Sequence, residues 1–288
     1  MTTSKKIFLH IGPPKTATTS LQSFFDQARD ELLVHGILYP TYGRPQPGES
    51  YWVERKPHKQ IYRSPVIHHQ FLPWTLLGEV ENLSPAKCWD LLLSEINETS
   101  AHTVVISAED FFRLKHPKIQ AVASYLSPYH VTVIVYYRDH FSRFLSSYTQ
   151  AVKKGRFFGS FQDFLKEKSG LVKYFYQQLK LWKDIFGESN VQIRNLKNNQ
   201  SKNTIEQDFI KILGLDEAVF EDYFNTAVQE NRSPKPEIIR LIRFVNWIEY
   251  SLGSRESLRG FFIKNRSTLM KEGSKLKALV ALISFLKQ

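Results

Sequence analysis

Cysteine is nearly absent from this sequence, which holds Cys88 alone among its 288 residues. A single cysteine excludes a disulfide within the chain and a metal site built from several thiolates. Such usage is typical of a reducing compartment, and we therefore expect a cytoplasmic protein. No cluster of residue types with the spacing of metal ligands compensates for the missing thiols, so we expect no metal.

Long hydrophobic runs are also missing. The apolar stretch after Lys5 and Lys6 is short and is broken by His10, so it does not resemble a signal peptide. No stretch reaches the roughly 20 apolar residues that span a bilayer, and we expect no stable membrane insertion. Residues 275–287 have an amphipathic pattern that fits either a membrane-surface helix or a helix packed on the core, and we favour the packed helix.

Acidic residues are outnumbered, because 28 Asp and Glu stand against 39 Lys and Arg, giving a formal net charge of +11. This balance fits nucleic acid, an anionic membrane surface or an anionic small ligand. The basic residues are scattered and no aromatic-basic RNA motif is present, so we expect no nucleic-acid partner. Much of the charge is that of a solvated surface, and part of it would serve an anionic ligand.

Hydrophobic residues make up 42% of the chain, enough for a sizeable core. Nearly continuous apolar runs predict buried strands at residues 7–11, 103–107, 131–137 and 191–194, with a shorter one at 37–39. Apolar periodicity predicts helices at residues 16–35, 85–98, 118–126, 141–152, 161–168 and 172–186. Strands of this kind alternating with helices indicate an α/β fold, a parallel sheet with helices on both faces, within a single domain over residues 1–288.

Two stretches depart from this alternation. Residues 40–75 are rich in Pro, Gly, Tyr, Trp and His without a clean period, and we expect a variable segment that covers an acceptor substrate. Its aromatic side chains suit a sugar, a ring system or a cationic group; they are Tyr42, Tyr51, Trp52, Tyr62, Phe71 and Trp74. Residues 203–288 read as mostly helical.

The strongest motif lies at residues 6–22, where an apolar run stops at Gly12 and a Pro-Pro turn delivers Lys15. A cluster of hydroxyl residues then opens an amphipathic helix. The free backbone N–H groups of a helix N-terminus attract anions, and the lysine adds a full charge. The sequence therefore predicts a site for a phosphate-like group here.

An ordinary nucleotide-binding P-loop, G-x-x-x-x-G-K-[ST], fits this motif only at Lys15 and Thr16. Leu9 and Pro14 stand where the two glycines belong, and Pro13 and Pro14 remove N–H groups that such a loop uses to wrap phosphate. A P-loop-type nucleotide kinase or hydrolase thus remains an alternative that lacks its glycines.

Residues 14–19, Pro-Lys-Thr-Ala-Thr-Thr, resemble the 5′-phosphosulfate loop P-K-[ST]-G-T-T of sulfotransferases that use 3′-phosphoadenosine 5′-phosphosulfate (PAPS). Ala17 replaces the glycine, and if position 17 is already helical, alanine there costs nothing. The resemblance implies a catalytic role for Lys15, on the oxygen that bridges sulfur and phosphate. It also implies a set of residues that bind the cofactor at this loop: Pro14, Lys15, Thr16, Ala17, Thr18 and Thr19.

A second anchor follows the strand at 131–137. Arg138 comes at the carboxyl end of that strand, where ligands bind in open α/β sheets. Arg138 with Ser146, eight residues on, resembles the 3′-phosphate site of the same sulfotransferases. Arg143 between them competes as a phosphate ligand, but we expect it on a solvated helix face.

Further resemblance covers roughly residues 5–250 and points to the bacterial branch of the family, through residues 174–194 and 231–233. It implies a P-loop-like three-layer sandwich with a helical C-terminal part. Leu196 stands where that branch commonly has tyrosine. Arg232, or alternatively Lys235, is expected to bind the nucleotide in place of an Arg-Lys-Gly loop that this chain lacks.

The acceptor needs a general base, and Glu109 is our choice because it follows the strand at 103–107 at the same edge as the loop. The resemblance supports this place, since the catalytic histidine of animal sulfotransferases follows the corresponding strand and some branches use glutamate. Histidines are the alternatives for this role: His10, His58, His68 and His69.

The sequence thus predicts a PAPS-dependent sulfotransferase that transfers a sulfuryl group by in-line displacement. The acceptor would be a small natural product or a carbohydrate, and transfer to a hydroxyl or to an amine or guanidine nitrogen stays open. A basic binding module for anionic polymers is the alternative outside enzymes. The sequence makes no prediction of the oligomeric state.

Overall fold

The computed structural model describes residues 4–46, 48–55, 58–63, 67–195, 204–226, 239–240 and 242–243. The chain divides into two compact units, which we describe separately. The first unit comprises Met1–Asp139 and Leu171–Glu230, and the second comprises His140–Gly170 and Asn231–Gln288. The expectation of a single domain stays a prediction.

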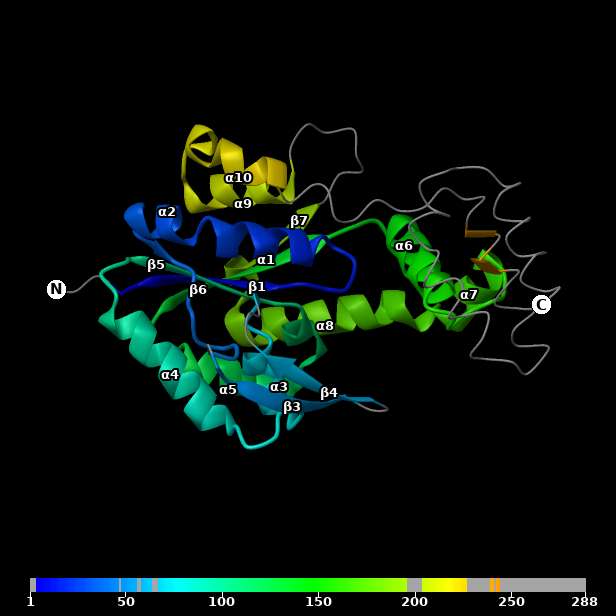
Figure 1. Cartoon of the computed structure of the whole chain (residues 1–288), viewed down its shortest axis with the longest axis horizontal. Helices are drawn as coiled ribbons and strands as arrows, with labels where there is room; N and C mark the ends of the chain where they lie inside the picture. Colours follow the sequence, from blue (N-terminus) through cyan, green and yellow to red (C-terminus); the bar gives the residue numbers. More distant parts are fainter. Residues whose placement is uncertain are drawn as a thin grey trace. The chain divides into compact units, whose positions relative to one another are not determined.

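The first unit is built on a five-stranded sheet (Figure 1), and its strand order is β2-β5-β1-β6-β7. All the pairings in this sheet are parallel. The strands are β1 (Lys6–Ile11), β2 (Ile37–Leu38), β5 (Thr103–Ala108), β6 (His130–Tyr137) and β7 (Val191–Asn195). This arrangement confirms the predicted α/β fold with a central parallel sheet.

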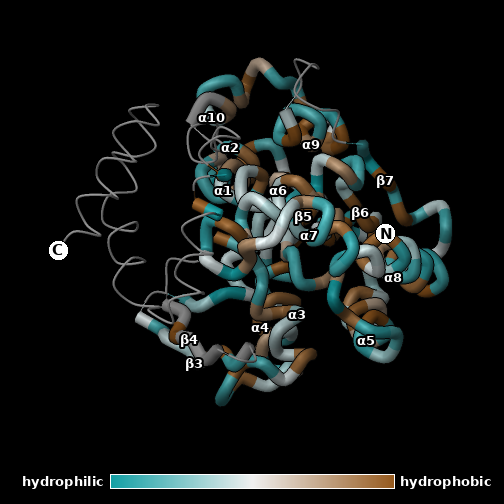
Figure 2. Tube along the Cα trace, turned by 90° about the vertical axis from the view of Figure 1, so that its right-hand side faces the viewer, coloured by the Kyte–Doolittle hydropathy of each residue, from teal (hydrophilic) through white to brown (hydrophobic). Residues whose placement is uncertain are grey.

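Helices cover both faces of the sheet, as the nearly continuous apolar strands require. One face carries α1 (Thr18–Gln27), α2 (Arg29–Val34), α9 (Ile205–Leu213) and α10 (Glu221–Thr226). The other carries α4 (Pro85–Glu98), α5 (His116–Tyr125) and α8 (Gly170–Phe186). The helices alternate hydrophobic and hydrophilic segments in Figure 2, the pattern of helices with one buried side.

Alternate residues of β1 enter two separate hydrophobic cores. Ile7, Leu9 and Ile11 pack in the cluster under α4, α5 and α8, with Trp89 and Trp182. Phe8 packs on the opposite cluster, which α1 and α9 supply with phenylalanines. β1 is therefore the central strand of a three-layer structure.

The chain leaves the strand ends toward opposite faces. The connection from β1 runs into α1 on one face, whereas β5 continues to α5 and the chain returns from β6 through α8, both on the other face. β1 lies between β5 and β6 in the sheet. On each side of the carboxyl end of β1, neighbouring strands therefore send their connections to opposite faces of the sheet. Ligand sites of open α/β sheets form at these reversals.

Residues 40–75 hold more regular structure than their composition indicates. They contain an antiparallel hairpin, β3 (Ser50–Arg55) and β4 (His58–Arg63), and the first part of α3 (Phe71–Leu77). Phe71 and Trp74 are buried in the core beneath α4. Because they are buried there, the expectation that these two rings face an acceptor is wrong, whereas Trp52 is 44% exposed.

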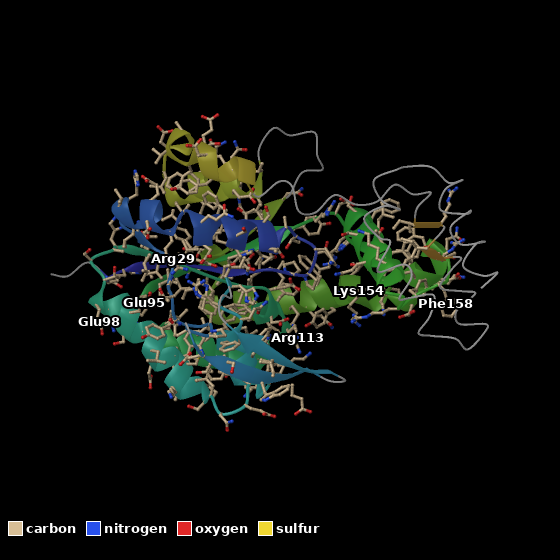
Figure 3. The ribbon with its side chains drawn as sticks, viewed as in Figure 1. Arg29, Glu95, Glu98, Arg113, Lys154 and Phe158 are labelled. Atoms are coloured by element: carbon tan, nitrogen blue, oxygen red, sulfur yellow. The ribbon has the colours of Figure 1, made fainter. Side chains whose placement is uncertain are left out.

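Side chains of two helices make hydrogen bonds with the backbone at the start of residues 40–75. Arg29 of α2 donates to the carbonyl oxygen of Tyr39 at 2.8 Å, and Glu95 of α4 accepts from the backbone N–H groups of Thr41 and Tyr42 (Figure 3). These charge-assisted bonds hold the start of the segment against the sheet.

Helix boundaries follow the sequence signals closely. α4 has the predicted bounds, with the Ser84 side chain accepting from the N–H of Lys87 and Pro85 in the first turn. The predicted helix 16–35 is instead two helices, α1 and α2, divided at Ala28.

The described part of the second unit contains α6 (His140–Lys153) and α7 (Phe161–Glu167). Tyr148 packs against Phe157, Phe161 and Phe164, with ring centroids 5.3–6.0 Å apart. The expectations for Arg232 and for residues 275–287 lie outside the described residues. Within residues 203–288, the described parts include the helices α9 and α10, as expected. Within the described ranges, no helix combines the length and apolar character needed to cross a bilayer.

Candidate functional site

The loop between β1 and α1 has two residues in the left-handed region of backbone conformation. Lys15 has φ 73° and Ala17, the residue before α1, has φ 58°. The expectation that position 17 is helical is wrong, because α1 begins at Thr18. A non-glycine residue in this region loses about 1–2 kcal/mol, so Ala17 is strained where the sulfotransferase pattern has glycine.

Two hydroxyl residues shape this loop from within. Thr16 is buried, and its Oγ1 donates to the carbonyl oxygen of Pro13 at 2.8 Å. Thr18 is buried as well, with Oγ1 3.5 Å from that of Thr16. Because the Thr16 hydroxyl donates its hydrogen to the carbonyl oxygen of Pro13, its main role in this structure is to close the loop.

The other residues of the motif lie nearer to solvent. Lys15 is partly buried, and Pro14, Ala17 and Thr19 are exposed. No side chain caps the N-terminus of α1, so the N–H groups of its first turn face the loop without a side-chain acceptor. A ten-residue helix with this end beside a lysine is suited to hold an anionic group.

Three predicted residues come from one edge of the sheet. Ile11 pairs with Ala108 in register, so the loop that carries Lys15 and the residue Glu109 both leave adjacent strands at the same level. Arg138 follows β6, the neighbour of β1 on the other side. Arg138 is partly buried and makes no hydrogen bond or ion pair within the described part of the chain. A cation placed in this way is available to a ligand.

The two carboxylates that follow β5 differ in their surroundings. Asp110 is buried, accepts from Nε1 of Trp74 at 2.6 Å and lies 3.4 Å from Arg113. Glu109, which opens the short 3₁₀ helix η1 (Glu109–Arg113), is only partly buried. Asp110 thus holds η1 against α3, and Glu109 is the less buried of the two carboxylates.

Two of the alternative histidines are parts of the core. His69 is fully buried; the N–H of Ser107 donates to its Nδ1 at 3.1 Å, and Nε2 donates to the carbonyl oxygen of Pro40 at 2.9 Å. Burial lowers the pKa of His69 to about 3, and that of His10 to about 3 as well. Both imidazoles are enclosed, so the structure speaks against either as the base.

The remaining histidines are less enclosed. His68 is partly buried, and burial lowers its pKa to about 4, which weakens it as a base at neutral pH. The side chain of His58 lies outside the described residues.

A polar chain behind the loop was not predicted from the sequence. Nε2 of Gln22 donates to Oγ of Ser107 at 3.1 Å, and that hydroxyl lies 2.8 Å from Nδ1 of His10. This chain joins α1, β5 and β1 directly behind the loop. Gln22 falls on the buried side of α1, and a buried amide on an otherwise apolar side is the signal that would have found it.

In the second unit, Arg143 is not on a solvated face as expected. It is buried at 8% exposure and its guanidinium lies 5.7 Å from the centroid of the Phe144 ring. Ser146 is partly buried, with no hydrogen bond of its hydroxyl within the described ranges. Arg138 belongs to the first unit and Ser146 to the second, so their expected convergence on one phosphate stays a prediction.

The similarity of this chain to known proteins lies in structure rather than in sequence. Neither a protein-family model nor a curated protein matches the sequence. Among solved structures, a sulfotransferase from Alicyclobacillus acidocaldarius is similar, with a TM-score of 0.43 and 14% sequence identity. The similarity covers 88% of this chain and 97% of that one.

Proposed function

We propose that this protein is a PAPS-dependent sulfotransferase. The observation that carries the proposal is the loop between β1 and α1, which presents Lys15 from a left-handed backbone beside an uncapped helix N-terminus. Glu109 and Arg138 leave the two strands adjacent to β1 at the same edge. A cation, a helix end, a carboxylate and a second cation are the groups that sulfuryl transfer requires.

The loop would hold the 5′-phosphosulfate end of PAPS. A Cβ atom on Gly12 would lie 2.5 Å from Oγ1 of Thr18, so glycine at residue 12 allows the first residue of α1 to pack close to the end of β1. Lys15 and the first-turn N–H groups of α1 would hold the 5′-phosphate, with Thr19 at the exposed rim and Arg138 on the 3′-phosphate. PAPS supplies the sulfuryl group, whose bond to the phosphate oxygen breaks as a bond to the acceptor forms.

Glu109 would accept the proton that the acceptor hydroxyl or nitrogen loses as it attacks sulfur. Lys15 would stabilise the negative charge that develops on the oxygen that leaves with the phosphate. The acceptor itself is a small molecule or a carbohydrate, and its binding surface would include the exposed part of residues 40–75, such as Trp52.

Transfer from labelled PAPS to pools of sugars and small metabolites tests the activity. In Lys15→Ala we expect transfer to be lost, and in Glu109→Gln a loss of about 100-fold or more in turnover, since general bases contribute 10²–10⁴-fold. Calorimetry with 3′-phosphoadenosine 5′-phosphate should show unchanged binding in Glu109→Gln and weakened binding in Lys15→Ala.

Lys87→Gln is the matched control, because Lys87 is an exposed lysine of α4. It should transfer sulfate as the unmodified protein does. Full activity in Lys15→Ala would refute the mechanism, and magnesium-dependent ATP turnover without binding of the phosphoadenosine nucleotide would favour the kinase class instead.

A further inference from the structure

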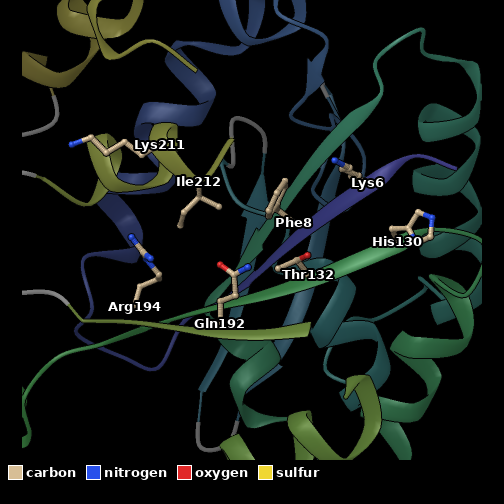
Figure 4. Close-up of a pocket in the computed structure, with 8 residues that line it drawn as sticks. All are labelled: Lys6, Phe8, His130, Thr132, Gln192, Arg194, Lys211 and Ile212. Carbon is tan, nitrogen blue, oxygen red and sulfur yellow. The ribbon is translucent and has the colours of Figure 1, made fainter. Parts of the chain in front are cut away.

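A depression lies at the amino-terminal ends of β1 and β6, away from the loop that carries Lys15 (Figure 4). It has a volume of about 460 Å³ and extends from the amino-terminal halves of β1 and β6 across β7, beside the last turn of α9. Its lining includes Lys6 and Phe8 of β1, Gln192 of β7 and Ile212 of α9. We call it the amino-end groove.

The groove exists because α9 is too short to cover the strands beneath it. Nine helical residues extend about 14 Å, whereas the eight residues of β6 extend about 26 Å. On the face toward α9, β6 places Ile134 and Tyr136 in the hydrophobic core and His130 and Thr132 in the groove. The change from apolar to polar along one strand marks where the helix ends.

Cationic side chains stand at both ends of the groove, with Phe8, Thr132 and Gln192 between them (Figure 4). At one end, the ammonium group of Lys6 is exposed and makes no hydrogen bond or ion pair within the described ranges. At the other end, Arg194 gives Nε and one terminal nitrogen to Asp208, and Lys211 pairs with Glu217 at 2.9 Å. Of the Lys and Arg side chains that line the groove, Lys6 is therefore the one that forms no ion pair within the described residues.

Apolar surface lies next to this cation. Phe8 is only partly buried, with one edge toward Phe209 at a centroid distance of 6.5 Å, and Ile212 is partly buried above it. The Thr132 hydroxyl and the Gln192 amide add groups that both donate and accept hydrogen bonds. The volume of the groove falls within the range of small-molecule sites.

We propose that the amino-end groove binds a small organic anion in which a ring carries a sulfate, sulfonate, phosphate or carboxylate group. The acidic group pairs with Lys6, the ring packs on Phe8 and Ile212, and polar substituents meet Thr132 and Gln192. A charge-assisted bond to Lys6, which makes no ion pair among the described residues, gives the orientation. The apolar floor adds affinity through burial of the ring.

The groove is separate from the loop that carries Lys15. Lys6 and Ile11 stand at the two ends of β1, about 17 Å apart along the strand. The proposal therefore does not depend on sulfuryl transfer, and binding in the groove is measured without PAPS.

The test is calorimetric titration of the full chain with 2-naphthalenesulfonate, with inorganic sulfate and 2-naphthol as the two partial probes. We expect saturable binding of the sulfonate and at least about tenfold weaker binding of either partial probe, since each keeps only one of the two interactions. Lys6→Gln should weaken the sulfonate about tenfold. Lys87→Gln, which removes another exposed lysine, should leave it unchanged.

Lys15→Ala separates the two sites. Unchanged sulfonate binding in Lys15→Ala supports the groove, and loss of binding there assigns the probe to the β1–α1 loop and overturns the proposal. Equal binding of the unmodified protein and Lys6→Gln, or the absence of saturable binding at millimolar sulfonate, overturns it as well. Lys6 is exposed at the first position of β1, and a thermal melt of Lys6→Gln checks that the fold is intact.

Discussion

Gly12 and Thr18 approach each other so closely that a Cβ atom on Gly12 would lie 2.5 Å from Oγ1 of Thr18 and 3.4 Å from its Cγ2. The first residue of α1 therefore rests on the backbone of the loop that precedes it. This contact draws the helix N-terminus toward the end of β1, and it explains why the apolar run stops at a glycine.

Gly12→Ala should push Thr18 away and shift the first turn of α1. Overpacking of this kind destabilises proteins by about 1–3 kcal/mol, and we expect a loss in that range in urea unfolding. Binding of 3′-phosphoadenosine 5′-phosphate should weaken further than the stability loss accounts for, because the N–H groups of the first turn move with Thr18.

Gly170→Ala is the control for this substitution. A Cβ atom on Gly170, the first residue of α8, meets no atom within 4 Å. Alanine is favoured over glycine in a helix by up to about 1 kcal/mol, so this variant should be as stable as the unmodified protein or slightly more stable. Normal nucleotide binding in Gly12→Ala would contradict the importance of the Gly12–Thr18 contact.

Ala17→Gly should stabilise the protein, which is unusual for a change from alanine to glycine. The left-handed backbone of Ala17 costs about 1–2 kcal/mol that glycine avoids, whereas glycine loses about 0.5–1 kcal/mol of extra chain entropy on folding. We expect a net gain of about 0.5–1 kcal/mol in the free energy of unfolding, measured by urea denaturation.

The same exchange within a helix should have the opposite sign. Ala123→Gly in the interior of α5 should destabilise by about 1 kcal/mol. If both variants lose stability equally, Ala17 is not strained in solution and the loop adopts a different backbone there.

The sequence predicted those parts of the fold that local pattern dictates. The apolar runs marked β1, β5, β6 and β7, and Ser84 with Pro85 marked the start of α4, because these signals reside in neighbouring residues. The hairpin β3–β4 was missed. In β3, Val53 is buried and the neighbouring Trp52 is exposed, yet both are apolar, so the sequence does not show the apolar–polar alternation that identifies a strand.

Within the site, the sequence predicted that Lys15, Glu109 and Arg138 follow strands at the carboxyl edge of a parallel sheet, because each comes directly after an apolar run. That these strands are neighbours is a result of the strand order, which the sequence did not predict. The left-handed backbone at Ala17 was not predicted either, because no local preference of alanine favours it. The burial of His10 and His69 likewise depends on helices far along the chain.

His69 should make the stability of the protein depend on pH. Burial holds its pKa at about 3 in the folded state, whereas an unfolded histidine titrates near 6.5. The unfolded state binds the extra proton between these values, so stability falls as pH drops below about 6.5. In His69→Gln, the slope of the free energy of unfolding against pH should be smaller by about 1.4 kcal/mol per pH unit between pH 5.5 and 4.5.

Tyr39→Phe provides a control at the same place, because the Tyr39 ring lies 4.7 Å from that of His69 and its hydroxyl donates to the carbonyl oxygen of Ile67. It should lower the free energy of unfolding by about 1 kcal/mol at every pH through the lost hydrogen bond, and leave the slope unchanged. An unchanged slope in His69→Gln would mean that His69 is protonated in the folded protein.

Arg138 should read the 3′-phosphate of the nucleotide, and two ligands isolate that contact. 3′-Phosphoadenosine 5′-phosphate carries the group, and adenosine 5′-phosphate lacks it. Arg138→Ala should weaken the first ligand by about 10–100-fold, the loss of a charge-assisted bond, and leave the second unchanged. Lys15→Ala should weaken both, because the proposed role of Lys15 is to bind the 5′-phosphate that the two ligands share.

Arg156→Ala removes another arginine, an exposed one in the second unit, and should change neither affinity. The measured quantity is the ratio of the affinities of each variant for the two nucleotides. A general loss of stability affects both affinities and does not change this ratio. Equal weakening of both nucleotides in Arg138→Ala would place the arginine at the 5′ end, or at the ring, and would leave the 3′-phosphate without a cation from the strands beside β1.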